Sequence, residues 1–301
     1  MENLTIFTPT YNRGYLIQRC YESLCRQSNK NFVWLIVDDG SIDNTEQIVN
    51  SFIKEKKIKI IYSKQKNSGK QVAHNTGVLM CTTKIFVCVD SDDYLSDNAV
   101  QLIYDTWDKI ESDRKLAGII ALKGNTFSEV VGTEMPNNIE RSSIFNLYEK
   151  YKFKGDAMLV FKTDILKKHL FPVFEGEKFI TEAVVYDQIS QKYEMKLLNK
   201  VLYFCEYLDD GYSKNIQSIH KKNPKGYMYF LEQRIENARD LKSKYKAVSY
   251  YIAGCLEIKS ISAYINCDFG FLKFISLPKG LIIYIKPIIK NKLVKYNIIK
   301  F

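Results

Sequence analysis

The chain has 301 residues, 46% of them hydrophobic, with 44 Lys and Arg against 34 Asp and Glu. This length accommodates one large α/β domain or a catalytic domain with an appendage, and the composition excludes a disordered or fibrous protein. No stretch approaches the roughly 18 uninterrupted apolar residues of a membrane-spanning helix. The first residues lack the basic start and long apolar run of a secretion signal, so we expect a cytoplasmic globular protein.

Short apolar runs alternate with helical patterns in the first half of the chain. The expected strands there cover residues 4–8, 33–37, 57–62 and 85–89, and the expected helices cover residues 15–26, 43–55 and 71–80. Strands separated by helices form parallel βαβ units with both faces of the sheet covered. Later strands are expected at 116–122, 158–161 and 199–206, and later helices at 227–245 and 247–265. These patterns predict an α/β fold and a helical C-terminal region, with a boundary near residues 205–225.

The segment Asp90-Ser91-Asp92-Asp93 closes the fourth expected strand. Ligands bind at the carboxyl ends of the strands in such sheets. Three carboxylates in four residues repel one another, and Mg²⁺ or Mn²⁺ would relieve this repulsion because hard cations prefer oxygen ligands. The alternative is a turn before the next helix, which Asp97 alone could cap. The sequence has neither a GxGxxG motif after the first strand nor a Walker A loop at Gly69-Lys70.

Four motifs follow one another across about the first 100 residues. They are Thr8-Pro9-Thr10-Tyr11-Asn12-Arg13, Val37-Asp38-Asp39-Gly40-Ser41-Ile42-Asp43, Asn67-Ser68-Gly69-Lys70 with Ala73-His74-Asn75-Thr76-Gly77, and Val89-Asp90-Ser91-Asp92-Asp93. In order and spacing they resemble glycosyltransferase family 2, the inverting nucleotide-sugar transferases with a GT-A fold. The resemblance implies a Rossmann-like, mostly parallel GT-A sheet in residues 1–210. Within it, residues 1–100 would bind the nucleotide sugar and residues 101–210 would form the acceptor and catalytic part. Residues 211–301 would form a basic, mainly helical region.

The resemblance also implies how the first two motifs hold the base of the nucleotide. Asp39 would accept a hydrogen bond from the uracil N3–H, and Asp38 would hold the turn around it. The backbone at Thr8 and Pro9 and the ring of Tyr11 would frame the base. For each of these residues the alternative is a purely structural role in a turn or cap.

The other two motifs would hold the diphosphate and the metal. Asn67 and Lys70 lie where the family often contacts the nucleotide or its diphosphate. Asp90, followed by Ser91, would meet the ribose or the metal, and Asp92 would ligate Mn²⁺ or Mg²⁺ directly. The ion would then stabilise the charge that develops as the nucleoside diphosphate departs.

An inverting transfer needs a general base that takes the proton of the acceptor hydroxyl. The family usually places it in a Glu-Asp pair, and the corresponding residues here are Glu182 and Ala183. Because Ala183 departs from that pair, Glu182 is the first candidate for the base, Asp187 the second and Glu177 the third. The alternative for Glu182 is an ordinary residue at a helix N-terminus.

Asp210 follows at a position where many relatives carry a histidine that completes the metal sphere. It could replace that histidine as a ligand of the metal. The alternative is a plain turn, since the dipeptide Asp210-Gly211 favours turns without any metal.

The net charge of +10 is concentrated at the C-terminal end of the chain. Residues 221–301 carry 16 basic and five acidic side chains, and residues 271–301 carry seven lysines and no acid. Lysines interleaved with Phe, Ile, Leu and Tyr suit the surface of an anionic membrane. The alternatives are a packed terminal helix with a solvated lysine face, or a nucleic-acid binder, for which no recognised motif is present.

The family resemblance, taken with these features, implies a metal-dependent inverting glycosyltransferase that uses a UDP-sugar. Its expected acceptor is a bacterial surface polysaccharide or a lipid-linked oligosaccharide, met at the inner face of the cytoplasmic membrane through residues 271–301. A nucleotidyltransferase is the first rival, but it should have a Gly-rich activating loop, which residues 8–13 lack. A non-catalytic module that binds nucleotide sugars stays open because of Ala183.

Overall fold

The computed structural model describes residues 3–125, 129–205 and 212–295. The chain divides into two compact units. The first comprises residues 1–171 and 185–208, and the second comprises residues 172–184 and 209–301. Each unit buries an apolar core of its own.

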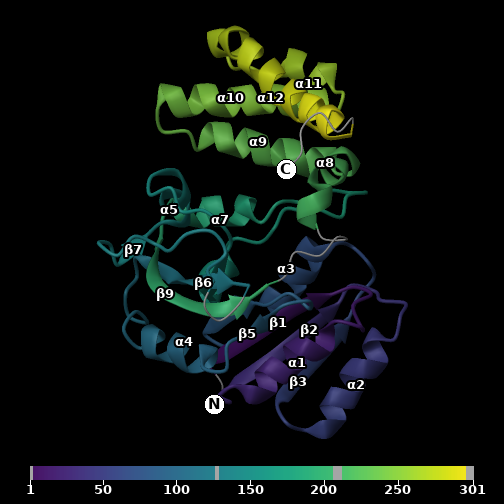
Figure 1. The fold of residues 1–301 in the computed structure, drawn as a ribbon, viewed down its shortest axis with the longest axis vertical. Helices are drawn as coiled ribbons and strands as arrows, with labels where there is room; N and C mark the ends of the chain where they lie inside the picture. The colour runs from purple at the N-terminus through teal and green to yellow at the C-terminus, as the bar shows by residue number, and fades with distance from the viewer. Residues whose placement is uncertain (1–2, 126–128, 206–211, 296–301) are drawn as a thin grey trace. The chain divides into compact units, whose positions relative to one another are not determined.

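The first unit is built on one β-sheet (Figure 1). Its strands among the described residues are β1 (Leu4–Thr10), β2 (Phe32–Asp38), β3 (Lys59–Lys64), β4 (Ile85–Cys88), β5 (Tyr94–Leu95), β6 (Leu116–Gly124), β7 (Arg141–Ser142), β8 (Ala157–Lys162) and β9 (Glu194–Phe204). They lie in the order β3-β2-β1-β4-β8-β6-β9-β5, with β7 paired to β9. The first four strands are parallel, as the alternation of strands and helices predicts.

Beyond β4 the sheet is mixed. β8 runs antiparallel to both β4 and β6, whereas β9 runs parallel to β6. The sequence predicted β9 at residues 199–206, but the strand already begins at Glu194. Three shifts of register interrupt its pairing with β6, and such bulges break the alternation of side chains on which strand prediction depends.

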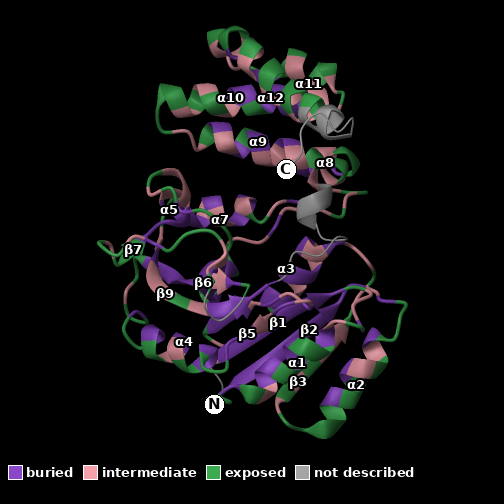
Figure 2. Cartoon of the chain, viewed as in Figure 1, coloured by how far each residue is buried: buried purple, intermediate pink, exposed green. Residues whose placement is uncertain are grey.

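Helices cover both faces of this sheet. In the first unit and at its junction they are α1 (Ile17–Arg26), α2 (Thr45–Glu55), α3 (Lys70–Met80), α4 (Ala99–Trp107), α5 (Ile144–Glu149), α6 (Thr163–Leu166) and α7 (Ala183–Ser190). α1, α2 and α4 share one buried cluster with the sheet. In it the Trp34 ring of β2 stacks with Tyr21 of α1 at 6.0 Å and with Phe52 of α2 at 6.3 Å. Figure 2 shows the resulting burial along β1 and β2.

α3 and α7 pack on the opposite face. The His74 ring of α3 lies 5.6 Å from Phe7 of β1 and 5.5 Å from Phe86 of β4. Phe86 is the register partner of Phe161 on β8, so the two side chains share this face. Tyr186 of α7 stacks on Phe161 at 5.7 Å. α7 is therefore held on the same side of the sheet as α3.

The second unit consists mainly of helices. They are α8 (Tyr212–Lys222), α9 (Pro224–Glu236), α10 (Leu241–Glu257), α11 (Ile261–Asn266) and α12 (Phe271–Lys295). α9 and α10 pack closely, because a Cβ added to Gly254 of α10 would lie 2.3 Å from the Leu231 side chain of α9. Among the described residues no helix is long and apolar enough to cross a lipid bilayer.

Two predicted helices of this unit are broken by capping residues. The predicted helix 227–245 is wrong, because Asp240 accepts a hydrogen bond from the Ser243 N–H at 2.8 Å and starts α10. The predicted helix 247–265 is likewise two helices. Lys259 adopts a left-handed conformation with φ of 57°, and Ser260 accepts from the Ala263 N–H at 3.2 Å to start α11. Asp and Ser side chains favour such N-terminal positions over helix interiors.

Candidate active site

The carboxyl ends of β1, β2 and β4 meet at one edge of the sheet. β1 lies between the other two strands, with Thr10 opposite Asp38 on β2 and Phe7 opposite Cys88 on β4. The polar segments that follow these strands therefore converge at this edge, where ligands bind in open parallel sheets.

Asp38 uses its carboxylate within the protein. The side chain is fully buried, and its Oδ1 accepts a hydrogen bond from the Ser41 N–H at 2.7 Å. Its Oδ2 accepts from the Tyr62 hydroxyl of β3 at 2.7 Å. Burial and this hydrogen bond raise the pKa of Tyr62 well above its usual value, so the phenol stays a donor. Asp38 thus ties the turn after β2 to β3.

Asp39 holds the loop that precedes α3. Its Oδ1 accepts hydrogen bonds from Gln65 Nε2 at 2.7 Å and from the Ser68 N–H at 2.9 Å, and its Oδ2 accepts from the Gly69 N–H at 2.7 Å. The side chain is buried. Gly40 lies against the same loop, because a Cβ added there would be 2.9 Å from the Asn67 nitrogen. Asp39 therefore fixes the backbone that leads to Asn67 and Lys70.

The substitution Asp39→Ala should lower the free energy of unfolding by about 3 kcal/mol, since each buried donor left without an acceptor costs about 1–3 kcal/mol. Urea unfolding followed by circular dichroism measures this change. Asp97→Ala is the matched control, because the Asp97 carboxylate is exposed and pairs with Arg26 at the surface, where ion pairs contribute little. Equal unfolding midpoints for both variants would contradict the stabilising role of the hydrogen bonds that Asp39 accepts from the loop before α3.

The turn after β1 is fastened to the turn after β2. Asn12, with φ of 51°, donates its N–H to Ser41 Oγ at 2.8 Å, and its Oδ1 accepts from the Ile42 N–H at 2.9 Å. The Gly14 N–H donates to Asp43 at 3.2 Å. These bonds leave Tyr11 at the surface with 46% of its side chain exposed. Its ring is thus available to a ligand.

Thr8 and Thr10 carry hydroxyl groups close to the carboxyl end of β1. Both residues are buried. The Thr8 hydroxyl accepts a hydrogen bond from Trp34 Nε1 at 2.9 Å, whereas Thr10 Oγ1 has no hydrogen-bond partner among the described residues. A buried hydroxyl without a partner is costly, so Thr10 marks a place that a polar ligand can satisfy. Pro9 lies between them on β1.

The acidic segment after β4 forms a network of hydrogen bonds and ion pairs. Lys70 Nζ, on the first residue of α3, lies 2.8 Å from Asp90 Oδ1. The Tyr203 hydroxyl of β9 accepts from the Asp90 N–H at 3.0 Å and donates to Asp93 Oδ2 at 2.6 Å. Lys123 Nζ lies 4.0 Å from the centre of the Tyr203 ring. The two outer aspartates are therefore held in place by residues from three other elements.

The charges of this segment are unevenly compensated. Burial alone would raise the pKa of Asp90, but Lys70 and Lys123 lower it below its usual value. Burial and the charge of Asp90 raise the pKa of Asp93 to about 7. Burial and Asp90 also raise the pKa of Asp92, and nearby cations offset only part of that effect. The environment of Asp92 thus favours an additional positive charge.

The carboxylates of Asp90 and Asp92 suit a hard divalent cation. Within the described ranges, no group of three or more His, Cys, Asp or Glu side chains could hold a metal ion. A cation here would therefore need oxygens from a ligand as well, which is usual for Mg²⁺ bound by one or two carboxylates and substrate phosphates. Asp210, the third predicted ligand, lies outside the described residues. Ser91, between the two aspartates, is buried.

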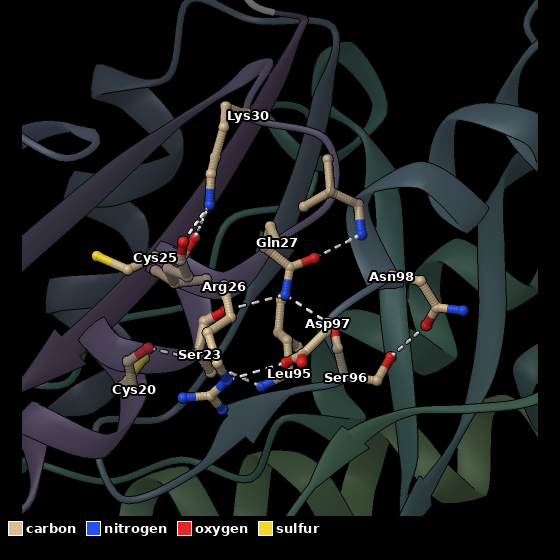
Figure 3. Close-up of polar contacts among 12 residues, drawn as sticks. Cys20, Ser23, Cys25, Arg26, Gln27, Lys30, Leu95, Ser96, Asp97 and Asn98 are labelled. Atoms are coloured by element: carbon tan, nitrogen blue, oxygen red, sulfur yellow. Dashed lines mark hydrogen bonds and ion pairs between the residues drawn. The ribbon is translucent and has the colours of Figure 1, made fainter.

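A buried amide anchors the chain just after the acidic segment (Figure 3). Gln27 at the end of α1 donates to the backbone oxygens of Ser23 at 3.1 Å and Ser96 at 2.7 Å, and accepts from the Val100 N–H at 3.0 Å. Ser23 Oγ accepts from the Leu95 N–H at 3.2 Å. These bonds fix β5 and the start of α4 against α1. The segment that carries Asp90 to Asp93 is therefore anchored at its downstream end.

The candidates for the general base occupy different environments. Glu182 is exposed and directly precedes α7, whereas Asp187 lies within α7 and is buried. Glu177 caps α9, since its two carboxylate oxygens accept from the Lys225 N–H at 2.7 Å and the Gly226 N–H at 2.8 Å. That role engages the carboxylate of Glu177 in the second unit.

Sequence reasoning missed four residues that shape this edge of the sheet. Tyr62 and Gln65 hold the two aspartates after β2, and Lys123 and Tyr203 surround Asp90. Lys123 gave one signal, because it is a charged residue at the end of the apolar run 116–122. The other three residues show nothing in the sequence that sets them apart from ordinary strand and loop residues.

Comparisons with known proteins agree with this arrangement. The family model for glycosyl transferase family 2 matches residues 5–170. Glycosyltransferase GlyA of Streptococcus pneumoniae is 28% identical over 67% of this chain, and the match spans only 30% of the length of GlyA. The GalNAc(5)-diNAcBac-PP-undecaprenol beta-1,3-glucosyltransferase of Campylobacter jejuni is 23% identical over 98% of this chain and 96% of its own length.

A solved structure shares the fold. It is that of TarS residues 1–349 from S. aureus in complex with UDP-GlcNAc, which superposes with a TM-score of 0.62 at 17% identity and covers 94% of this chain and 81% of its own. The α/β GT-A class expected from the sequence is therefore confirmed. By the extent of the family match, this chain belongs to glycosyl transferase family 2.

Proposed function

We propose that this chain is a metal-dependent inverting glycosyltransferase. It transfers a sugar from a nucleotide donor, with a UDP-sugar as the first candidate, to a hydroxyl of a bacterial surface polysaccharide or a lipid-linked oligosaccharide. The observation that carries the proposal is the convergence of the ends of β1, β2 and β4, where Lys70 Nζ lies 2.8 Å from Asp90 Oδ1. Family membership and the UDP-GlcNAc complex of TarS support it.

The proposed base pocket lies between the turns after β1 and β2. The carboxylate of Asp39 accepts three hydrogen bonds, and a carboxylate offers about four acceptor sites. One site on Oδ2 therefore remains for the uracil N3–H. Thr10 Oγ1 is a second polar atom for the base. Thr8 and Pro9 supply backbone, and the exposed ring of Tyr11 offers a surface for stacking.

The proposed diphosphate and metal sites lie at the ends of β4 and the α3 loop. Asp92 is the first metal ligand and Asp90 the second, with Ser91 and Asn67 beside the nucleotide. A bound divalent ion stabilises the negative charge that develops on the departing diphosphate. The ion pair of Lys70 with Asp90 supports this assignment, because the site attracts positive charge and the Asp90 side chain is still 32% exposed.

The proposed acceptor rests on the composition of residues 271–301 and on the name of one relative. The name of the Campylobacter jejuni relative describes transfer to an undecaprenol-linked glycan. An acceptor of that kind is carried by a membrane, and residues 271–301 are basic and apolar. We therefore place the reaction at the inner face of the cytoplasmic membrane. The general base is Glu182 or Asp187.

A thermal-shift screen tests donor and metal together. UDP-, dTDP-, GDP- and CMP-sugars are each added with and without Mn²⁺. A ligand that binds only the native state stabilises it by mass action, by about 2.7 kcal/mol at a hundred times its Kd. One UDP-sugar should raise Tm most, and Mn²⁺ should increase that rise. No shift with any nucleotide sugar would contradict the proposed donor site.

Because of Ala183, one alternative function stays open: a module that binds nucleotide sugars without transferring them. It stands where the family usually has the Asp of the Glu-Asp pair. A donor that binds with Mn²⁺ but is never consumed, even with a lipid-linked glycan present, would favour this alternative.

A further inference from the structure

The last described helix, α12, has an inner face that is fixed on α10. Ser276 is fully buried, and Leu277 packs against the core of the second unit. A Cβ added to Gly280 would lie 2.7 Å from Ile252 Cγ2 of α10. This close approach leaves no space for a larger side chain, so the inner face is committed to the core.

The outer face of α12 is exposed (Figure 2), and many of its exposed side chains are apolar. Eight large apolar side chains of this helix are exposed, each by 39% to 76%: Phe271, Phe274, Ile275, Leu281, Ile282, Ile285, Ile288 and Ile289. Their spacing of three, four and seven residues places them along one stripe of a helix, here called the outer stripe. Monomeric soluble proteins rarely expose large apolar patches, so eight exposed apolar side chains on one side of a helix suggest a binding surface.

The charged side chains that α12 itself carries are all positive. Residues 271–301 contain seven lysines and no acid. Among them, Lys286 is exposed, whereas Lys273 donates to the Ile265 oxygen at 2.7 Å and Lys279 lies 4.7 Å from the Tyr245 ring centre, so these two side chains contact neighbouring parts of the second unit. Lysines that flank an apolar stripe are typical of helices that lie in the interface of an anionic membrane.

We propose that the outer stripe docks on an anionic lipid bilayer, with α12 lying in the plane of the membrane surface. The apolar side chains enter the boundary between head groups and acyl chains, and exposed lysines such as Lys286 contact anionic head groups. The inner face stays on α10, so docking needs no unfolding of the second unit. A second copy of the chain suits the stripe less well, because residues 271–301 carry lysines and no acid, so two copies of this segment would bring like charges together.

The docking surface is tested with the full chain and vesicles, without any sugar donor. Vesicles of phosphatidylcholine alone are compared with vesicles that also contain phosphatidylglycerol, in a flotation assay at low and high salt. The variant Phe274→Ser/Ile282→Ser/Ile285→Ser removes the centre of the outer stripe. The control Ile53→Ser/Leu79→Ser/Leu241→Ser removes three apolar side chains that are exposed elsewhere.

The wild type and the control should bind the anionic vesicles, and high salt should weaken that binding. The stripe variant should bind at least about tenfold more weakly, with unchanged circular dichroism. Equal binding of the stripe variant and the wild type would overturn the proposal. So would equal binding to neutral vesicles, or a wild-type dimer in solution that the stripe variant converts to a monomer. A failed donor screen would leave this result untouched, because no nucleotide takes part.

Discussion

Asp92→Asn should lower kcat by on the order of 10³-fold, since removing an interaction that stabilises developing charge costs several kcal/mol. The same variant should lose the Mn²⁺-dependent part of the thermal shift. Its Tm without ligands should equal or slightly exceed that of the wild type, because burial and the charge of Asp90 raise the pKa of Asp92 and asparagine carries no charge to bury or repel. Steady-state kinetics and thermal unfolding with and without Mn²⁺ measure the three effects.

Asp97→Asn is the matched control, because it makes the same chemical change five residues further along the chain. Asp97 is exposed and pairs only with Arg26 among the described residues, so kcat and the Mn²⁺ effect should stay at the level of the wild type. If Asp92→Asn kept its activity and its response to Mn²⁺, the metal would have to bind elsewhere. If its Tm fell sharply, Asp92 would be a structural residue.

The sequence alone located the ends of β2 and β4 to within one residue, because the pattern there is local. Asp38 and Asp90 directly follow apolar runs, and parallel strands bring their carboxyl ends together. The partners of these residues come from far along the chain. Tyr203 bridges Asp90 and Asp93 from β9, 110 residues beyond Asp93. Only the order of strands in the sheet decides that contact, and no local pattern encodes it.

The contrast between local patterns and contacts that only the fold decides also applies to the charge and exposure of the C-terminal region. The count of lysines predicted a basic C-terminal region, but periodicity could not say which apolar face of α12 packs on α10. That choice depends on Gly280, whose missing side chain lets the two helices approach. In the same way, the motif around Asp39 predicted a ligand contact. In the structure, the Asp39 carboxylate also accepts three hydrogen bonds from residues of the loop before α3.

Glu182→Gln should lower kcat by about 10²–10⁴-fold, the usual contribution of a general base. Glu182 is exposed and lies just before α7, so donor binding and Tm should not change. Because the base must be ionised, kcat/KM of the wild type should fall at acid pH. That acid limb should disappear in the variant, whose residual activity has no carboxylate left to protonate. Initial rates across a pH series with a lipid-linked acceptor measure both effects.

Two further variants decide between Glu182 and its competitor. Glu175→Gln makes the same change at another exposed glutamate of residues 172–184 and should leave the rate unchanged. Asp187 is buried on α7, so Asp187→Asn should lower Tm as well as the rate, since it disturbs a polar group inside the fold. A large loss of kcat in Asp187→Asn at unchanged Tm, with an active Glu182→Gln, would move the base to Asp187. Because Asp187 is buried, the acceptor hydroxyl would then have to reach the buried face of α7.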